Sequence, residues 1–152
     1  MAKIEGEIVI GRPVDVVFDM VADQRNEPTY NPTMTRSEKL TDGPIGVGTR
    51  FRATTAARRR PIDMLIEYTA YDRPSSLVST TRMAAADVHG ILTFTPDPAG
   101  TLMRWSWDLT PKHASLLLTP LVAWLGRRQE RRIWTGLKQL LEGASAPPAH
   151  PS

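Results

Sequence analysis

Histidine is the side chain best suited to acid–base chemistry near neutral pH, and this chain has three of them. We expect His89 on the outer face of a strand, His113 at the start of the last helix and His150 in the C-terminal tail. A metal site needs two or three converging ligands, and no histidine here has a partner at ligand spacing. The sequence therefore predicts neither a metal ion nor another cofactor.

Carboxylates are the next candidates, because a buried carboxyl group with a raised pKa can act as a general base. Asp63 and Glu67 share the polar face of one expected strand, and Asp108 lies on the polar face of another. The alternation of side chains thus predicts that these acids are solvated, and it places no carboxylate on an inward face. The chain has no cysteine, which excludes disulfides and thiolate chemistry.

The inward positions of the expected strands carry large apolar side chains with a few hydroxyl groups among them. Such a wall suits a mid-sized aromatic or lipid-like ligand, although the same residues could simply fill a core. Trp105 and Trp107 are the foremost wall residues, and Tyr68, Ser79 or Thr81 could orient a carbonyl or hydroxyl group. With residues from the helices, the candidate ligand-binding set is Tyr30, Phe51, Met64, Ile66, Tyr68, Ser79, Thr81, Leu92, Phe94, Met103, Trp105, Trp107, Leu125 and Gln129.

These inward positions depend on a series of strands in which residues alternate between the two faces of a sheet. After a first strand, Pro13 favours a helix start, and a second short helix is expected at Asp23–Tyr30. Period-two alternation and turn residues such as Gly and Pro predict the rest of the sheet. The predicted strands are Lys3–Ile10, Met34–Leu40, Thr49–Ala56, Pro61–Tyr71, Leu77–Met83, Val88–Thr95 and Thr101–Leu109. Consecutive strands joined by short turns imply an antiparallel sheet.

One long helix closes the chain. A helical region begins at Lys112–Leu118, and Pro120 predicts a kink or a fresh start there. The main helix, Pro120–Leu141, ends at Gly143. Gly126 and Gly136 near its inward stripe either leave room for a ligand or allow close packing. The apolar stripe is predicted to consist of Val122, Leu125, Ile133, Leu137 and Leu140.

Length and composition indicate one α+β domain over residues 1–143 with a disordered tail, 144–152. No run of about 18 apolar residues and no signal peptide is present, so we expect a cytoplasmic protein. The net charge is only +3. The arginines of the chain cluster at Arg58–Arg60 and around Glu130. Because these clusters lack the interleaved aromatic residues of a nucleic-acid site, we expect no nucleic-acid partner.

The order of these motifs resembles the SRPBCC superfamily, the START-like or helix-grip fold, and within it the polyketide cyclase/dehydrase-like branch. The resemblance covers about Ile4 to Leu141. It implies a curved seven-stranded antiparallel sheet that grips the C-terminal helix, with a cavity between them. The motifs that carry it are Ile10–Pro13 with Val17 and Phe18, Asp23, Tyr30–Pro32, Asp42–Phe51, Glu67–Pro74, Gly90–Phe94 and Gly100–Asp108.

Three functions follow as hypotheses. The first is binding of a hydrophobic small molecule, lipid-like or polyketide-like, between sheet and helix. The second is a cyclase or dehydratase that uses the same cavity, with Tyr68 or a Ser/Thr hydroxyl assisting proton transfer. The third is a partner or membrane-surface module, because Leu116–Trp124 is apolar and is followed by arginines. The chain is expected to be a monomer or a homodimer.

Overall fold

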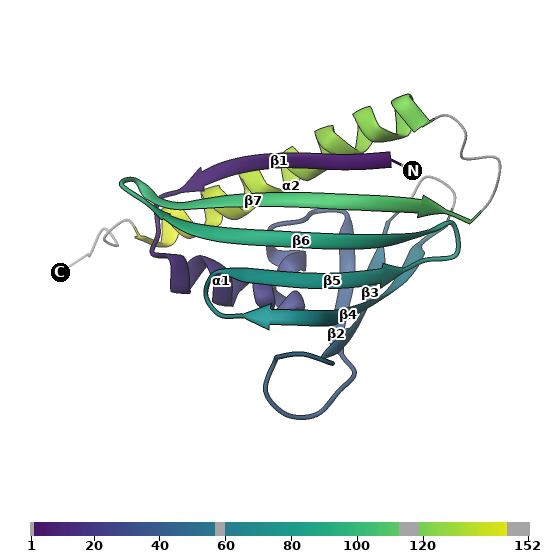
Figure 1. The fold of residues 1–152 in the computed structure, drawn as a ribbon, viewed down its shortest axis with the longest axis horizontal. Helices are drawn as coiled ribbons and strands as arrows, with labels where there is room; N and C mark the ends of the chain where they lie inside the picture. Colours follow the sequence, from purple (N-terminus) through teal and green to yellow (C-terminus); the bar gives the residue numbers. More distant parts are fainter. Residues whose placement is uncertain (1, 57–59, 113–118, 146–152) are drawn as a thin grey trace.

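The computed structural model describes residues 2–56, 60–112 and 119–145. Seven strands form one antiparallel sheet in the order β1-β7-β6-β5-β4-β3-β2. Strands β2 to β7 follow one another as a meander, and β1 pairs with β7 at one edge (Figure 1). The strands are β1 (Ala2–Ile10), β2 (Met34–Lys39), β3 (Arg50–Thr55), β4 (Ile62–Asp72), β5 (Ser76–Arg82), β6 (Ala86–Asp97) and β7 (Gly100–Pro111).

Helix α1 (Val14–Ala22) and the 3-10 helix η1 (Gln24–Thr29) connect β1 to β2. Pro13 precedes the first turn of α1, where its missing N–H costs nothing. The Asp23 side chain accepts a hydrogen bond from the Arg25 main-chain N–H and so caps η1. This tight junction fixes the direction in which η1 crosses the sheet.

Helix α2 (Thr119–Ser145) crosses the sheet near β1 and β7 (Figure 1). Its C-terminal half is anchored at the start of the first helix, where Glu142 accepts a hydrogen bond of 2.8 Å from the Gly11 N–H. Gly136 lets the helix approach the turn after η1, since a Cβ there would lie 2.5 Å from the Tyr30 carbonyl oxygen. The sheet and the helices α1, η1 and α2 thus enclose one core.

An aromatic cluster lies where α1 meets the sheet. The Phe18 ring contacts Phe94 and Tyr71 edge to face, at centroid distances of 5.1 and 5.3 Å. Edge-to-face pairs of this kind add to the apolar area that they bury. Because Phe18 and Phe94 are almost fully buried, this end of the sheet–helix interface is filled with side chains.

The predicted α+β architecture is confirmed, with a seven-stranded sheet and a long C-terminal helix. The strand faces also agree with the alternation, since His89 is exposed and Phe51 and Met103 are buried. A register shift in β4 after Tyr68 changes the face of the residues that follow. It brings Tyr71 towards the core, where its ring stacks with Tyr68 at 6.4 Å.

Two details of the long helix were predicted wrongly. Leu140 is 38% exposed, whereas Leu141 is 7% exposed and belongs to the core, because the inward stripe continues from Leu137 by four residues. The helix also passes Gly143, where it was predicted to end, and continues to Ser145. Residues 113–118, including His113, and His150 in the tail lie outside the described part of the chain.

Candidate functional site

A cavity of about 330 Å³ lies between the concave side of the sheet and the helices η1 and α2. Strands β3 to β7 supply an apolar wall whose polar groups are a few hydroxyls and the Trp107 indole N–H. The helices supply the amide and carboxyl groups. The lining residues are Ile4, Gln24, Glu27, Met34, Thr55, Ile62, Met64, Ile66, Ser79, Thr81, Met83, Val88, Leu92, Trp107, Leu109, Gly126, Gln129, Glu130, Ile133 and Trp134.

The structure divides the sequence-predicted ligand-binding residues into three groups. Part of the set lines this cavity: Met64, Ile66, Ser79, Thr81, Leu92, Trp107 and Gln129. A second part is buried in the core but is not among the lining residues: Tyr30, Phe51, Tyr68, Phe94, Met103 and Trp105. The side chain of Leu125 lies outside the described part of the chain. Alternation identified inward side chains, but only some of them reach the open space.

The two neighbouring tryptophans of β7 illustrate this division. Trp107 lines the cavity and lies over Gly90 of β6, where a Cβ would come within 2.0 Å of its ring. Trp105 is 4% exposed, and its ring contacts Trp134 at a centroid distance of 5.9 Å. The glycine opposite Trp107 therefore allows this indole to lie against the sheet and form part of the cavity wall.

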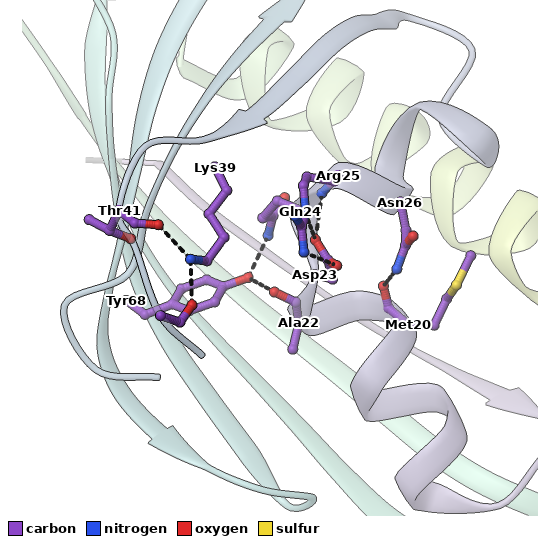
Figure 2. A network of polar contacts seen from close by, with 10 residues as sticks. Met20, Ala22, Asp23, Gln24, Arg25, Asn26, Lys39, Thr41 and Tyr68 are labelled. Atoms are coloured by element: carbon purple, nitrogen blue, oxygen red, sulfur yellow. Dashed lines mark hydrogen bonds and ion pairs between the residues drawn. The ribbon is translucent and has the colours of Figure 1, made fainter. Parts of the chain in front are cut away.

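Tyr68 has a structural contact in place of the predicted ligand contact (Figure 2). Its hydroxyl donates to the Ala22 carbonyl oxygen at 2.5 Å and accepts from Gln24 Nε2 at 3.1 Å. Burial raises the pKa of this phenol well above its ordinary value, and the Gln24 hydrogen bond only partly opposes it. The hydroxyl thus joins the sheet to the α1–η1 junction and holds Gln24 in place beside the cavity.

The sequence analysis did not identify Glu130, which lines the cavity from α2. The residue is half-buried, and its carboxyl group accepts a hydrogen bond of 2.9 Å from Trp134 Nε1, one turn further along the helix. Burial raises the pKa of Glu130 to about 7; the negative charge of Glu27 adds to the increase, and the two indole N–H groups oppose it. This carboxyl group therefore titrates near neutrality.

The Trp107 N–H differs from that of Trp134. It is buried and makes no hydrogen bond of normal geometry within the described residues. It nevertheless lies near enough to the Glu130 carboxyl group to favour the charged form. The Glu130 carboxyl group thus has two indole N–H groups beside it, of which only that of Trp134 makes a hydrogen bond of normal geometry.

A second carboxyl group, that of Glu27, reaches the cavity from η1. Its Oε1 accepts a hydrogen bond of 2.9 Å from Asn31 Nδ2. Asn31 is itself 2% exposed and is oriented by Thr33, whose N–H and hydroxyl both donate to Asn31 Oδ1. Burial raises the pKa of Glu27, and the Asn31 hydrogen bond opposes that rise.

The expectation that the carboxylates are solvated is therefore wrong for Glu27 and Glu130. Neither lies on a strand, so strand alternation carried no information about them. Between residues 126 and 134, Gly126, Glu130 and Trp134 recur at four-residue spacing, which places them on one helix face. That spacing was the available signal, and the surrounding arginines obscured it.

The described part of the chain holds no group of three His, Asp or Glu side chains that could bind a metal ion. Likewise, none of its helices is long and apolar enough to cross a membrane. The region Leu116–Trp124, on which the membrane and partner hypothesis was based, has no described side chains. That hypothesis stays a prediction.

A family model matches residues 1–142, almost the whole chain; its description is polyketide cyclase/dehydrase and lipid transport. The chain belongs to this family. The family is part of the SRPBCC superfamily, as the sequence motifs indicated. A search of curated proteins gave no match.

Solved structures share the fold of this family member. A START superfamily protein from Mycobacterium smegmatis superposes with a TM-score of 0.82 at 13% identity, covering 95% of this chain and 100% of the other. The protein TTHA0849 from Thermus thermophilus superposes with a TM-score of 0.81 at 20% identity, covering 95% and 99%. At these identities the comparison shows the helix-grip fold and nothing more specific.

Proposed function

We propose that this protein binds a hydrophobic small molecule in the cavity between the sheet and the helices η1 and α2. The observation that carries the proposal is the cavity itself, with about 330 Å³ of space and an apolar wall that holds few polar groups. Pockets for small ligands have this composition, with polar groups that fix orientation. The family description, which includes lipid transport, supports the same function.

The volume limits the size of the ligand. Ligand pockets generally span about 300 to 1,000 Å³. This cavity is near the lower limit, at about 330 Å³. A fused aromatic molecule or a single short chain fits such a space, whereas a two-chain lipid does not. We therefore expect a mid-sized ligand.

Native mass spectrometry of the purified protein, followed by denaturing extraction, tests the proposal. A co-purified apolar molecule that is lost in Ser79→Phe would support it, because the new ring fills the cavity from its β5 wall. Thr80→Phe is the matched control, since the neighbouring side chain points to the opposite face of the sheet. Equal occupancy in both variants, or no binding in a screen of aromatic and lipid-like molecules, would contradict the proposal.

A second candidate is an enzyme of the cyclase or dehydratase type. It is favoured by Glu130, whose pKa of about 7 in an apolar cavity suits general acid–base catalysis at neutral pH. The Tyr68 hydroxyl is already hydrogen-bonded on both sides, so Glu130 takes the proton-transfer role. Turnover of polyketide-like substrates by the wild type but not by Glu130→Gln would support this function. Equal turnover by both proteins would refute it.

A further inference from the structure

The polar groups of the cavity are strongly unbalanced in charge. Glu27 and Glu130 both line it, and the described residues that line it include no lysine, arginine or histidine. Each carboxylate accepts one hydrogen bond of normal geometry, from Asn31 and Trp134 respectively, and the Trp107 N–H also lies near Glu130. Gln24 Oε1 is also buried and has no hydrogen-bond partner among the described residues. The helical side of the cavity therefore has spare acceptors and negative charge.

Two half-buried carboxyl groups that line one cavity need compensation. Each loses hydration, and each charge raises the cost of ionising the other. The described lining residues supply no positive charge to offset this cost, and burial raises the pKa of both Glu27 and Glu130. Without a ligand, protonation of a carboxyl group lowers this cost, and a bound cation would lower it further.

The surroundings of the pair confirm the imbalance. Tyr30 packs against the same helices and is kept neutral, since burial first and then the Glu27 charge raise the pKa of its phenol. Asp23 is already paired with Arg25, at 2.8 Å. The four arginines nearest to Glu130 on α2 have exposed side chains and do not line this cavity: Arg127, Arg128, Arg131 and Arg132.

Aromatic rings accompany the carboxyl groups. Trp107 and Trp134 line the same cavity, one from the sheet and one from α2. Indole is the aromatic group that attracts cations most strongly, and the attraction grows when water is excluded. Two carboxylates and two indoles, with no cation among the described lining residues, are the combination expected where a protein binds a positively charged organic group.

We propose that this cavity selects an organic cation: an apolar molecule of cavity size whose protonated amine lies between Glu27 and Glu130. The inference rests on the proposed function and names the class of ligand. The apolar wall of β3 to β7 would hold the hydrocarbon part. The spare carboxylate oxygens and Gln24 Oε1 would accept the three N–H bonds of the ammonium group.

The same geometry disfavours other ligand classes. A fatty acid or another carboxylate would place a third negative charge beside Glu27 and Glu130. In the part of the chain that the structure describes, no lysine or arginine lines the cavity to pair with it. A neutral alcohol could satisfy one acceptor but would leave the charge uncompensated. Like-charge repulsion and unpaired acceptors thus give selectivity among molecules with the same apolar part.

The predicted binding depends on pH in a defined direction. A cation favours the ionised form of Glu130, so its binding releases the proton that Glu130 holds in the empty protein. Affinity should therefore rise with pH until Glu130 is fully ionised in the empty protein. A primary alkylamine stays protonated over this range, because its pKa is near the lysine value of about 10.4. From about pH 6 to about pH 8 the expected increase is about tenfold.

Three probes with one ring system and different head groups test the inference: naphthylethylamine, naphthylethanol and naphthylacetate. Isothermal titration calorimetry at pH 6 and pH 8 measures each affinity. The amine should bind about tenfold more tightly than the alcohol at pH 8, and the acetate should bind least. Only the amine should gain affinity from pH 6 to pH 8.

Glu130→Gln should remove both the preference for the amine and its pH dependence while the alcohol binds as before. Glu27→Gln provides a second test if the first variant folds poorly, and Glu5→Gln, an exposed carboxylate of β1, is the control. If the alcohol binds as tightly as the amine, the inference is overturned and the proposed function stands. If none of the three probes binds, both fail.

Discussion

Replacing Glu130 by glutamine should stabilise the protein above neutral pH and leave its stability nearly unchanged in acid. In the folded protein, burial raises the pKa of this carboxyl group to about 7, from an ordinary value of 4.5. The folded state thus holds the proton more tightly than the unfolded state does. The stabilisation from the bound proton is complete below pH 4.5 and is lost as the pH rises through 7.

The size of the effect follows from the two pKa values. Each pKa unit corresponds to about 1.4 kcal/mol, so ionising Glu130 in the folded protein costs about 3 kcal/mol once the pH exceeds 7. Glutamine has the same shape and keeps a carbonyl oxygen that can accept the Trp134 N–H, but it never ionises. We therefore expect the variant to gain about 2 to 3 kcal/mol at pH 8.

Urea denaturation of both proteins at several pH values between about 4.5 and 8.5 measures the difference in the free energy of unfolding. The curves should converge in acid and separate between about pH 5 and pH 8. Glu5→Gln, in which an exposed carboxylate is removed, controls for the change in net charge. A difference that is constant with pH would refute the reasoning, because it would mean that the pKa of Glu130 is not shifted by folding. A variant that is less stable at pH 8 would also refute it, because it would mean that the fold stabilises the ionised carboxylate.

Three further changes test the fold around the cavity. Gly90→Ala should displace the Trp107 ring, because the new Cβ would lie 2.0 Å from it. The variant should lose about 1 to 3 kcal/mol of stability in thermal denaturation, and it should also bind the ligand less tightly. Tyr68→Phe should cost about 1 to 2 kcal/mol, because it leaves a buried carbonyl without its donor. In calorimetry it should lower the affinity for an amine less than Glu130→Gln does, because Gln24 loses an anchor while both carboxylates stay. In urea denaturation, Leu141→Ala should lower the free energy of unfolding by at least about 2 kcal/mol, and Leu140→Ala by less than about 1 kcal/mol. Equal losses would contradict the assignment of Leu141 to the inward face of α2.

The sheet was predictable from the sequence because its strands alternate regularly and end at glycine and proline. The strand Pro61–Tyr71, for example, is observed as β4 (Ile62–Asp72). The register shift after Tyr68 could not be predicted, since it depends on how β5 pairs with β4 and no residue type marks it. Its effect on Tyr71 is visible only in the folded structure.

The candidate site was predictable on its sheet side only. A strand residue is directed inward or outward by its position, so Met64, Ser79 and Trp107 could be assigned to the concave face from the sequence alone. Whether an inward residue touches open space is a different matter. Phe51 and Met103 are just as inward, but neighbouring side chains cover them completely.

The helical side determines the chemistry, and there the sequence is least informative. Glu130 stands among four arginines, a pattern typical of a solvated helix face, and Glu27 lies in a six-residue 3-10 helix without clear periodicity. They become one site only when α2 and η1 are brought over the sheet. The apolar wall explains why a molecule would enter the cavity, and this acidic end decides which molecule would stay. Selectivity in this protein should therefore change with substitutions at Glu27 and Glu130, whereas substitutions of aliphatic strand residues such as Met64 and Leu92 should change affinity for every ligand alike.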